Sequence, residues 1–188
     1  MADVKLRALP SFDARTAGRA VSVVAGALLV ALGAQVAVPL PGTPIPITLQ
    51  LPAVLIVGGL LGPGLGAASL VLYLAMGAGG LPVFAPAGVP GVARLLGPTG
   101  GYLLAMPLAA AAVGRLTAHA SAKHIAVAMI VGLLIIHAGG IAQLAVLGGD
   151  LSVAMQLGSV PFLVGDLVKL LFAGLIIGKF SSRTRALV

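Results

Sequence analysis

The chain has 188 residues, of which 60% are hydrophobic and only 8% are charged. Soluble domains carry about 25% charged residues, so this chain would expose large apolar patches if it folded in water. Its net charge of +7 is high enough for a nucleic-acid-binding protein. However, most cations lie at the termini and in one loop, and the aromatic residues that would stack on bases make up only 4%. No nucleic-acid partner is therefore expected, and the lack of cysteine excludes disulfides and iron–sulfur clusters.

The apolar residues lie in long runs, which favours helices that cross a lipid bilayer. Inside a membrane every backbone polar group must be paired within the protein, so only helices or a closed barrel can span it. A barrel would alternate apolar and polar residues over segments of about ten residues. The runs Val21 to Val38 and Ile125 to Ile136 do not alternate. The sequence predicts an all-α, multi-pass integral protein of the cell membrane.

The first predicted elements are a polar tail, a span and a loop. Residues 1–18 carry most of the N-terminal charges and are expected to form a tail. The first span is predicted from Arg19 to Val38, because about 20 apolar residues cross the hydrocarbon. Four prolines follow in residues 39–50, which excludes a regular helix there and predicts a loop.

The next apolar region is interrupted. Two stretches, Leu51 to Leu61 and Leu65 to Met76, are separated by Gly62-Pro63-Gly64. Each is shorter than a normal span, so the pair could form one re-entrant element. We favour two separate spans, because the first stretch can extend back into the preceding loop.

Three further spans complete the prediction. Residues 77–101 are rich in glycine and proline and are expected to form a long loop. Spans are predicted at about 102–116, 125–147 and 160–180. The transmembrane, substrate-binding domain thus covers 19–180, and a basic tail, 181–188, follows it.

The distribution of basic residues predicts the orientation. Lys and Arg collect in cytoplasmic loops, and here they collect in both tails and in residues 115–124. The other loops contain a single cation, Arg94. Both termini are then cytoplasmic and the number of spans is even: six, or four if 51–76 is re-entrant. We expect a bundle of six helices, with the loops 39–50, 77–101 and 148–159 outside.

Two charges within the last span are candidates for ligand binding. Asp166 and Lys169 are three residues apart and so share one helix face. Each charge costs at least about 2.5 kcal/mol at the centre of a bilayer. They could simply neutralise each other, but replacing such a pair by apolar residues is often neutral or stabilising, so its presence suggests a function. Together they offer acceptors and donors that match a ligand with N–H beside C=O, such as a urea or an amide.

The outer loops supply further candidates. Arg94 could bind a carboxylate through two parallel hydrogen bonds, or could be a solvated loop charge. Thr48 and Gln50 could cap the following helix or contact a ligand. Phe84 and Tyr102 could stack on a ligand or anchor the chain at the membrane interface.

Other polar and small residues have simpler interpretations. His119 and His124 lack the spacing of metal ligands, and His137, alone in its span, is interpreted as a residue of helix packing or of a weak polar contact. No metal site and no cofactor are expected. No nucleophile–base pair or phosphate-binding loop is present, so no enzymatic activity is predicted for this chain. Ala27 and Ala31 are one turn apart, as in helix faces that approach a neighbour closely.

Five motifs occur in order along the chain: Ala34-Gln-Val-Ala-Val-Pro-Leu-Pro41, Pro46-Ile-Thr-Leu-Gln50, Gly80-Leu-Pro-Val-Phe84, Gly97-Pro-Thr-Gly-Gly-Tyr102 and, after Pro161-Phe162, Gly165-Asp-Leu-Val-Lys169. Together they resemble the BioY family, the biotin-binding S components of energy-coupling factor (ECF) transporters. The resemblance covers nearly the whole chain outside the tails. It implies six helices, a biotin pocket near the extracellular face, and partnership with a membrane-coupling T subunit and two cytoplasmic ATPase subunits.

The resemblance also suggests roles for the candidate residues. The ureido ring of biotin would suit Asp166 and Lys169, and its carboxylate would suit Arg94, although Lys169 could take the carboxylate instead. The apolar parts of biotin would suit Phe84 or Tyr102. Residues 39–50 could act as a lid. By position, Ala27 and Ala31 would meet the coupling subunit.

Three other functions remain open at this point. The chain could be an S component for another vitamin, such as thiamin or riboflavin. It could be a secondary transporter that works alone, with Asp166 as its proton site. It could also be a membrane scaffold without a ligand. A nickel or cobalt S component is not favoured, because the chain begins Met1-Ala2 rather than Met-His.

Overall fold

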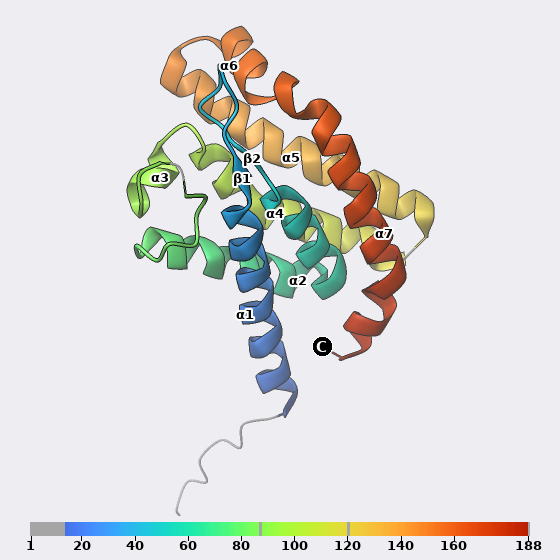
Figure 1. The fold of residues 1–188 in the computed structure, drawn as a ribbon. Coiled ribbons are helices and arrows are strands. Elements are labelled where there is room, and N and C mark those ends of the chain that lie inside the picture. The colour runs from blue at the N-terminus through green and yellow to red at the C-terminus, as the bar shows by residue number, and fades with distance from the viewer. Residues whose placement is uncertain (1–13, 87, 120, 188) are drawn as a thin grey trace, which may run out of the picture.

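The computed structural model describes residues 14–86, 88–119 and 121–187, so most of the predicted N-terminal tail lies outside the described residues. The described chain is mainly helical (Figure 1). Among the described residues, four helical segments are long and apolar enough to cross a membrane, and one apolar helix is shorter. The predicted all-α class is thereby confirmed, and the lengths and hydropathy of these helices agree with a membrane protein. The four segments are α1 (Ala14–Gln35), α2 (Gln50–Ala78), α5 (Ala122–Gly148) and Leu151–Arg185, which contains α6 (Leu151–Gly158) and most of α7 (Leu163–Leu187); the shorter helix is α4 (Gly100–Leu116).

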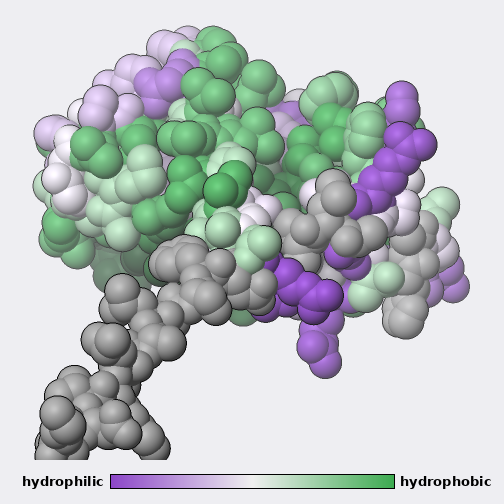
Figure 2. All heavy atoms as spheres, turned by 90° about the horizontal axis from the view of Figure 1, so that it is seen from below, coloured by the Kyte–Doolittle hydropathy of each residue, from purple (hydrophilic) through white to green (hydrophobic). Residues whose placement is uncertain are grey.

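Large apolar side chains cover much of the outer surface of the bundle. Leu134 on α5 is 60% exposed and Leu171 on α7 is 66% exposed. Figure 2 shows hydrophobic surface over a large part of the face seen from below. Such a surface would associate in water but is stable against lipid tails.

Helix α1 ends earlier than predicted, and a small hairpin follows it. The helix stops at Gln35, and residues predicted as its last turn form the short strand β1 (Ala37–Val38). This strand pairs antiparallel with β2 (Ile47–Thr48). The prolines between the strands cannot take part in a helix, so the hairpin projects from the end of α1 toward α6 (Figure 1).

Helix α2 is folded back on itself at Gly62. The backbone of Gly62 has φ 81° and ψ −179°, which is outside the helical region and is tolerated by glycine. The amide of Gln50 donates to the hydroxyl of Tyr73 at 2.9 Å. In a straight helix these residues would be about 35 Å apart. The two arms, 50–61 and 63–78, are therefore antiparallel and pack against each other.

The lengths of these arms bear on the number of spans. At 1.5 Å per residue the arms measure about 18 and 24 Å, whereas the hydrocarbon core is about 30 Å thick. The break predicted at Gly62-Pro63 is confirmed. The count of six spans and the cytoplasmic location of the termini stay predictions.

Helix α4 packs between α2 and α5 through glycines. Gly58 on α2 contacts the backbone of Ala110, and Gly101 on α4 contacts the backbone of Gly139 on α5. A Cβ atom at Gly58 or Gly101 would overlap the neighbouring backbone. Contact between small residues allows helices to approach closely in lipid, and here it brings α2, α4 and α5 together around one cavity.

Short helices occupy two of the predicted loops. The loop 77–101 contains α3 (Val92–Leu96), and the loop 148–159 contains α6, whose N-cap is Asp150. A 3-10 turn, η2 (Val160–Phe162), leads into α7, and another, η1 (Thr117–His119), follows α4. Helix α7 continues to Leu187, through nearly all of the predicted C-terminal tail.

Arg185, near the end of α7, binds carbonyl groups at the bend of α2. Its guanidinium donates to the carbonyl oxygens of Gly59 at 2.8 Å, Gly114 at 3.0 Å and Thr117 at 3.1 Å. In a helix the carbonyl of Gly59 would accept from residue 63, but Pro63 has no N–H. Arg185 supplies the missing donor and ties α7 to α2 and α4.

We expect Arg185→Ala to lower the stability of the protein by about 2–4 kcal/mol, because several carbonyl groups would lose their donor. Thermal unfolding in detergent, followed by circular dichroism, should show a midpoint lower by about 5 °C or more. Arg183→Ala is the control, since Arg183 is exposed on the same helix. Equal midpoints for the two variants would contradict the role given to Arg185.

Candidate functional site

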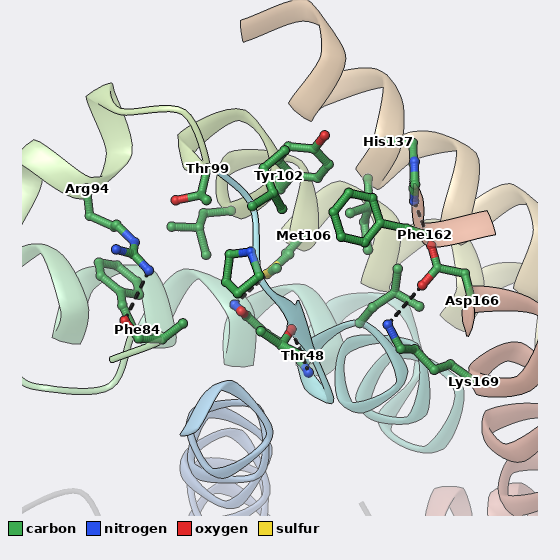
Figure 3. Close-up of a pocket in the computed structure, with 17 residues that line it drawn as sticks. Thr48, Phe84, Arg94, Thr99, Tyr102, Met106, His137, Phe162, Asp166 and Lys169 are labelled. Carbon is green, nitrogen blue, oxygen red and sulfur yellow. Dashed lines mark hydrogen bonds and ion pairs between the residues drawn. The ribbon is translucent and has the colours of Figure 1, made fainter. Parts of the chain in front are cut away.

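A cavity lies at the end of the bundle where α2, α4 and α7 begin (Figure 3). Its wall is built from the loop containing β2, from α2, α3, α4, α5 and α7, and from the segment that includes Phe84. The centres of water molecules can occupy about 80 Å³ of it. That is room for several waters.

Asp166 forms the polar centre of one side of this cavity. Only 2% of the residue is exposed, and both carboxylate oxygens are engaged. One oxygen accepts from the ammonium of Lys169 at 3.0 Å, and the other lies 2.9 Å from Nε2 of His137. The predicted contact of Asp166 and Lys169 on one helix face is confirmed. A buried carboxylate needs such partners, because an unpaired charge in the membrane is costly.

His137 joins this cluster from α5, where its sequence position predicted only helix packing or a weak polar contact. Its Nδ1 lies 2.9 Å from the hydroxyl oxygen of Ser159, so both ring nitrogens have partners. The ring of Tyr102 packs edge-on against it with centroids 6.1 Å apart. One signal in the sequence could have found it. Ionisable residues within apolar spans usually pair with one another, and both His137 and Asp166 lie within predicted apolar spans.

Arg94 lies on the opposite side of the cavity from Asp166 (Figure 3). It belongs to α3 and is only 6% exposed, so the alternative of a solvated loop charge is wrong. Its Nη2 donates to the carbonyl of Ala85 at 3.0 Å. Its Nη1 occupies the space beside Gly88 where a side chain would lie, and that glycine has φ 120°. Burial lowers the pKa of Arg94 from its ordinary value, but a guanidinium remains charged in proteins.

Aromatic and thioether groups line the cavity between these two polar sides. Phe84 packs edge-on against Tyr73 with centroids 5.4 Å apart, and its ring fills the space beside Gly77. The hydroxyl of Tyr102 donates to the carbonyl of Gly158 at 2.6 Å. Tyr102 therefore contributes its ring to the cavity, while its hydroxyl ties α4 to α6. Phe162 and Met106 complete this apolar part.

Thr48 and Gln50 both line the cavity, and both already have partners. The hydroxyl of Thr48 accepts from the backbone N–H of Gln50 at 3.3 Å. The N-cap of α2 is Leu49, and no side chain caps this end of the helix, so the capping role considered for Thr48 and Gln50 is wrong. The side-chain amide of Gln50 donates to Tyr73 and to the sulfur of Met106. Gln50 thereby holds the two arms of α2 together at the base of the cavity.

The loop between β1 and β2 contributes to the cavity wall. Ile45 and Pro46 form part of its wall. The hydroxyl of Thr43 donates to the carbonyl of Leu157 on α6 at 2.7 Å. This hydrogen bond links the loop to α6.

Ala27 and Ala31 are not on an outer surface. They are 0% and 8% exposed, and they lie on the face of α1 that packs within the chain. Gly26 on the same face lies against Ser69 and Val57 of α2. In this conformation the two alanines contact the chain's own helices, so they do not offer the partner contact predicted for them.

A bundle of apolar helices that holds a small cavity, charged on two opposite sides and apolar between them, is the architecture of a substrate-binding membrane protein. The BioY family model matches residues 6–186. A probable biotin transporter BioY of Pyrococcus horikoshii is 40% identical over 83% of this chain and 91% of its own length. The biotin transporter BioY of Thermotoga maritima is 39% identical over 79% of this chain and 86% of its own length. This chain belongs to the BioY family.

A solved structure has the same fold. It is the crystal structure of the S-component for biotin from an ECF-type ABC transporter. The two structures superpose with a TM-score of 0.79, covering 88% of this chain and 91% of the other, at 24% sequence identity. At this level of identity the match concerns the fold.

Proposed function

We propose that this protein binds biotin and takes it up across the cell membrane as the substrate-specific subunit of an ECF-type transporter. The observation that carries the proposal is the cavity with Arg94 on one side and the Asp166 cluster on the other. Biotin has a ureido ring at one end, a carboxylate at the other, and an apolar body between them. Its polar groups match the two sides of the cavity, and its body matches the apolar wall.

The ureido ring would lie at Asp166 and Lys169. Its two N–H groups need acceptors, which the carboxylate supplies, and its C=O needs a donor, which the ammonium supplies. His137 and Ser159 would hold Asp166 in place from behind. The carboxylate of biotin would accept two parallel hydrogen bonds from the guanidinium of Arg94. Phe84 and Tyr102 would contact the ring system and the chain, and Thr48 and Gln50 would line the bound ligand.

Transport would require partners, because no nucleotide-binding loop is found in this sequence. A membrane-coupling T subunit and two ATPase subunits would supply the energy, and ATP would be hydrolysed on the latter. This chain would capture the ligand and move with it, without catalysing a reaction.

The other candidate functions fit the cavity less well. A secondary transporter needs a carboxylate that gains and loses protons, but both oxygens of Asp166 are engaged by cationic or hydrogen-bonding partners. A scaffold without a ligand would have no reason to bury Arg94 and Asp166 on opposite sides of one cavity.

Mass spectrometry of small molecules that co-purify with the detergent-solubilised protein tests this function. We expect biotin to be found after expression in cells supplied with biotin, thiamin and riboflavin. Titration of the stripped protein should show saturable binding of biotin and none of the other two vitamins. Recovery of thiamin or riboflavin, or of no vitamin in either measurement, would contradict the proposal.

His137→Ala is expected to weaken biotin binding about tenfold. The variant removes one hydrogen bond to the buried carboxylate of Asp166, which is worth about 1.5 kcal/mol. Isothermal titration calorimetry with biotin measures the change. His124→Ala, at the far end of the same helix, is the control and should bind like the unmodified protein. Equal biotin affinities for the two variants would contradict the assignment of His137 to the binding site.

A further inference from the structure

A second cavity lies at the other end of the same helices. It is lined by the bend of α2 from Leu61 to Leu65, by the end of α4, and by Arg19 of α1 and Arg185 of α7. The centres of water molecules can occupy about 710 Å³ of it. Figure 2, seen from below, shows hydrophilic surface gathered toward one side of that face, beside hydrophobic surface. The distribution of basic residues predicts that this end faces the cytoplasm.

The bend of α2 gives this cavity its polar character. Gly62 and Pro63 interrupt the helical hydrogen bonds, so the carbonyl of Gly59 needs another donor. Arg185 fills that role, and it also donates to the hydroxyl of Thr117 at 2.7 Å. The acceptors found for this guanidinium are neutral. They fix its position without cancelling its charge, so the wall of the cavity keeps a positive charge.

Two further arginines bring positive charge to the same cavity. Arg19 comes from the first turns of α1, and Arg115 from the last turn of α4, where it is exposed. Within the described ranges no acidic residue lines the cavity. The acidic residues in those ranges are Asp150 and Asp166, and both lie toward the other end of the bundle. Three guanidinium groups from three helices therefore surround one hollow, which favours an anion.

The chemistry of the wall points to a phosphate group that carries hydrocarbon chains. Guanidinium groups suit phosphate because they donate paired hydrogen bonds to its oxygens. Leu61 and Leu65 line the same cavity. On α1, beyond Arg19, the apolar side chains of Val21 and Leu28 are 68% and 48% exposed and could contact acyl chains. Basic pockets between membrane helices on the cytoplasmic side typically bind the head groups of anionic lipids.

We propose that this cavity binds the phosphate head group of an anionic phospholipid from the inner leaflet, such as phosphatidylglycerol. The head group lies among Arg19, Arg115 and Arg185, and the acyl chains lie along α1 and the bend of α2. The site is separate from the biotin cavity and does not depend on the function proposed for it.

Native mass spectrometry of the detergent-purified full chain tests this site. The protein is titrated with phosphatidylglycerol or with phosphatidylcholine, which carries a phosphate but no net charge. The test variant is Arg19→Gln/Arg115→Gln, because replacing Arg185 would also loosen the fold. The matched control is Lys123→Gln/Arg183→Gln, which removes two positive charges from side chains outside the cavity.

We expect the unmodified protein and the control to retain one phosphatidylglycerol in preference to phosphatidylcholine. The test variant should bind phosphatidylglycerol about 30-fold more weakly, since each arginine near a membrane surface contributes about fivefold. Biotin binding should be unchanged in all of them. Undiminished lipid binding by the test variant, or an equal loss in the control, would overturn the proposal.

A soluble phosphate compound is the competing source of the anion. Glycerol 1-phosphate is therefore added at millimolar concentration to the lipid-bound protein. A lipid site should keep its phosphatidylglycerol, because the soluble compound lacks the acyl chains. Displacement of the lipid at that concentration would show that the cavity selects phosphate alone and would overturn the assignment to a lipid.

Discussion

Asp166→Asn is expected to weaken biotin binding by about 10²- to 10³-fold. Removing one partner of a buried ion pair costs about 3–5 kcal/mol, because the other charge is left without compensation. Here Lys169 would lose its counter-charge, and an asparagine amide would offer only one oxygen where Lys169 and His137 now bind two. The ureido N–H groups of biotin would also lose a charged acceptor. Titration calorimetry of the purified variant measures the effect.

Asp150→Asn is the matched control for this variant. Asp150 is exposed and accepts from the backbone N–H of Val153 at the start of α6, outside the cavity. Its replacement should leave biotin affinity within about twofold. The comparison separates the loss of the site from a general effect of removing one negative charge. Affinity near that of the unmodified protein in Asp166→Asn, with the fold intact by circular dichroism, would refute the assignment of Asp166.

Arg94→Gln is expected to weaken biotin binding by about 10²-fold, because two charge-assisted hydrogen bonds to the carboxylate would be lost. Biotin methyl ester provides the decisive comparison, since it has the ureido ring but no negative charge. Its affinity should change less than about threefold between the unmodified protein and Arg94→Gln. Competition against labelled biotin measures both ligands on the same samples.

This pair of ligands distinguishes a binding role for Arg94 from a structural one. Arg94 also donates to the carbonyl of Ala85, so a merely structural loss would weaken both ligands equally. That result would contradict the contact with the carboxylate. Arg183→Gln removes the same charge at the opposite end of the molecule and should leave both affinities unchanged.

The local features of the site could be predicted from the sequence. Asp166 and Lys169 are one helical turn apart, so their contact depends only on the geometry of α7. The bend at Gly62-Pro63 follows from the properties of those two residues. Arg94 stood out because it was the single cation in the outer loops, although its burial was not predictable from that.

The contacts between distant residues were not predictable in this way. His137 and Asp166 are 29 positions apart and meet because α5 and α7 pack together. Gln50 reaches Tyr73 because the arms of α2 close on each other. Ala27 and Ala31 have the spacing typical of a helix–helix interface. Spacing alone does not indicate which helix packs against them, and in this structure that helix is α2.

The sequence by itself determined that this is a helical membrane protein, since hydropathy and charge act locally and identify the segments that lipid can surround. It also identified the charged residues whose burial in the membrane costs so much free energy that they suggest a function. The tertiary structure alone decided how those charges are arranged. Glycine contacts set how closely α2, α4 and α5 approach one another. The packing of the helices places Arg94 and the Asp166 cluster on opposite sides of one cavity. It also brings Arg19, Arg115 and Arg185 to the wall of a second cavity.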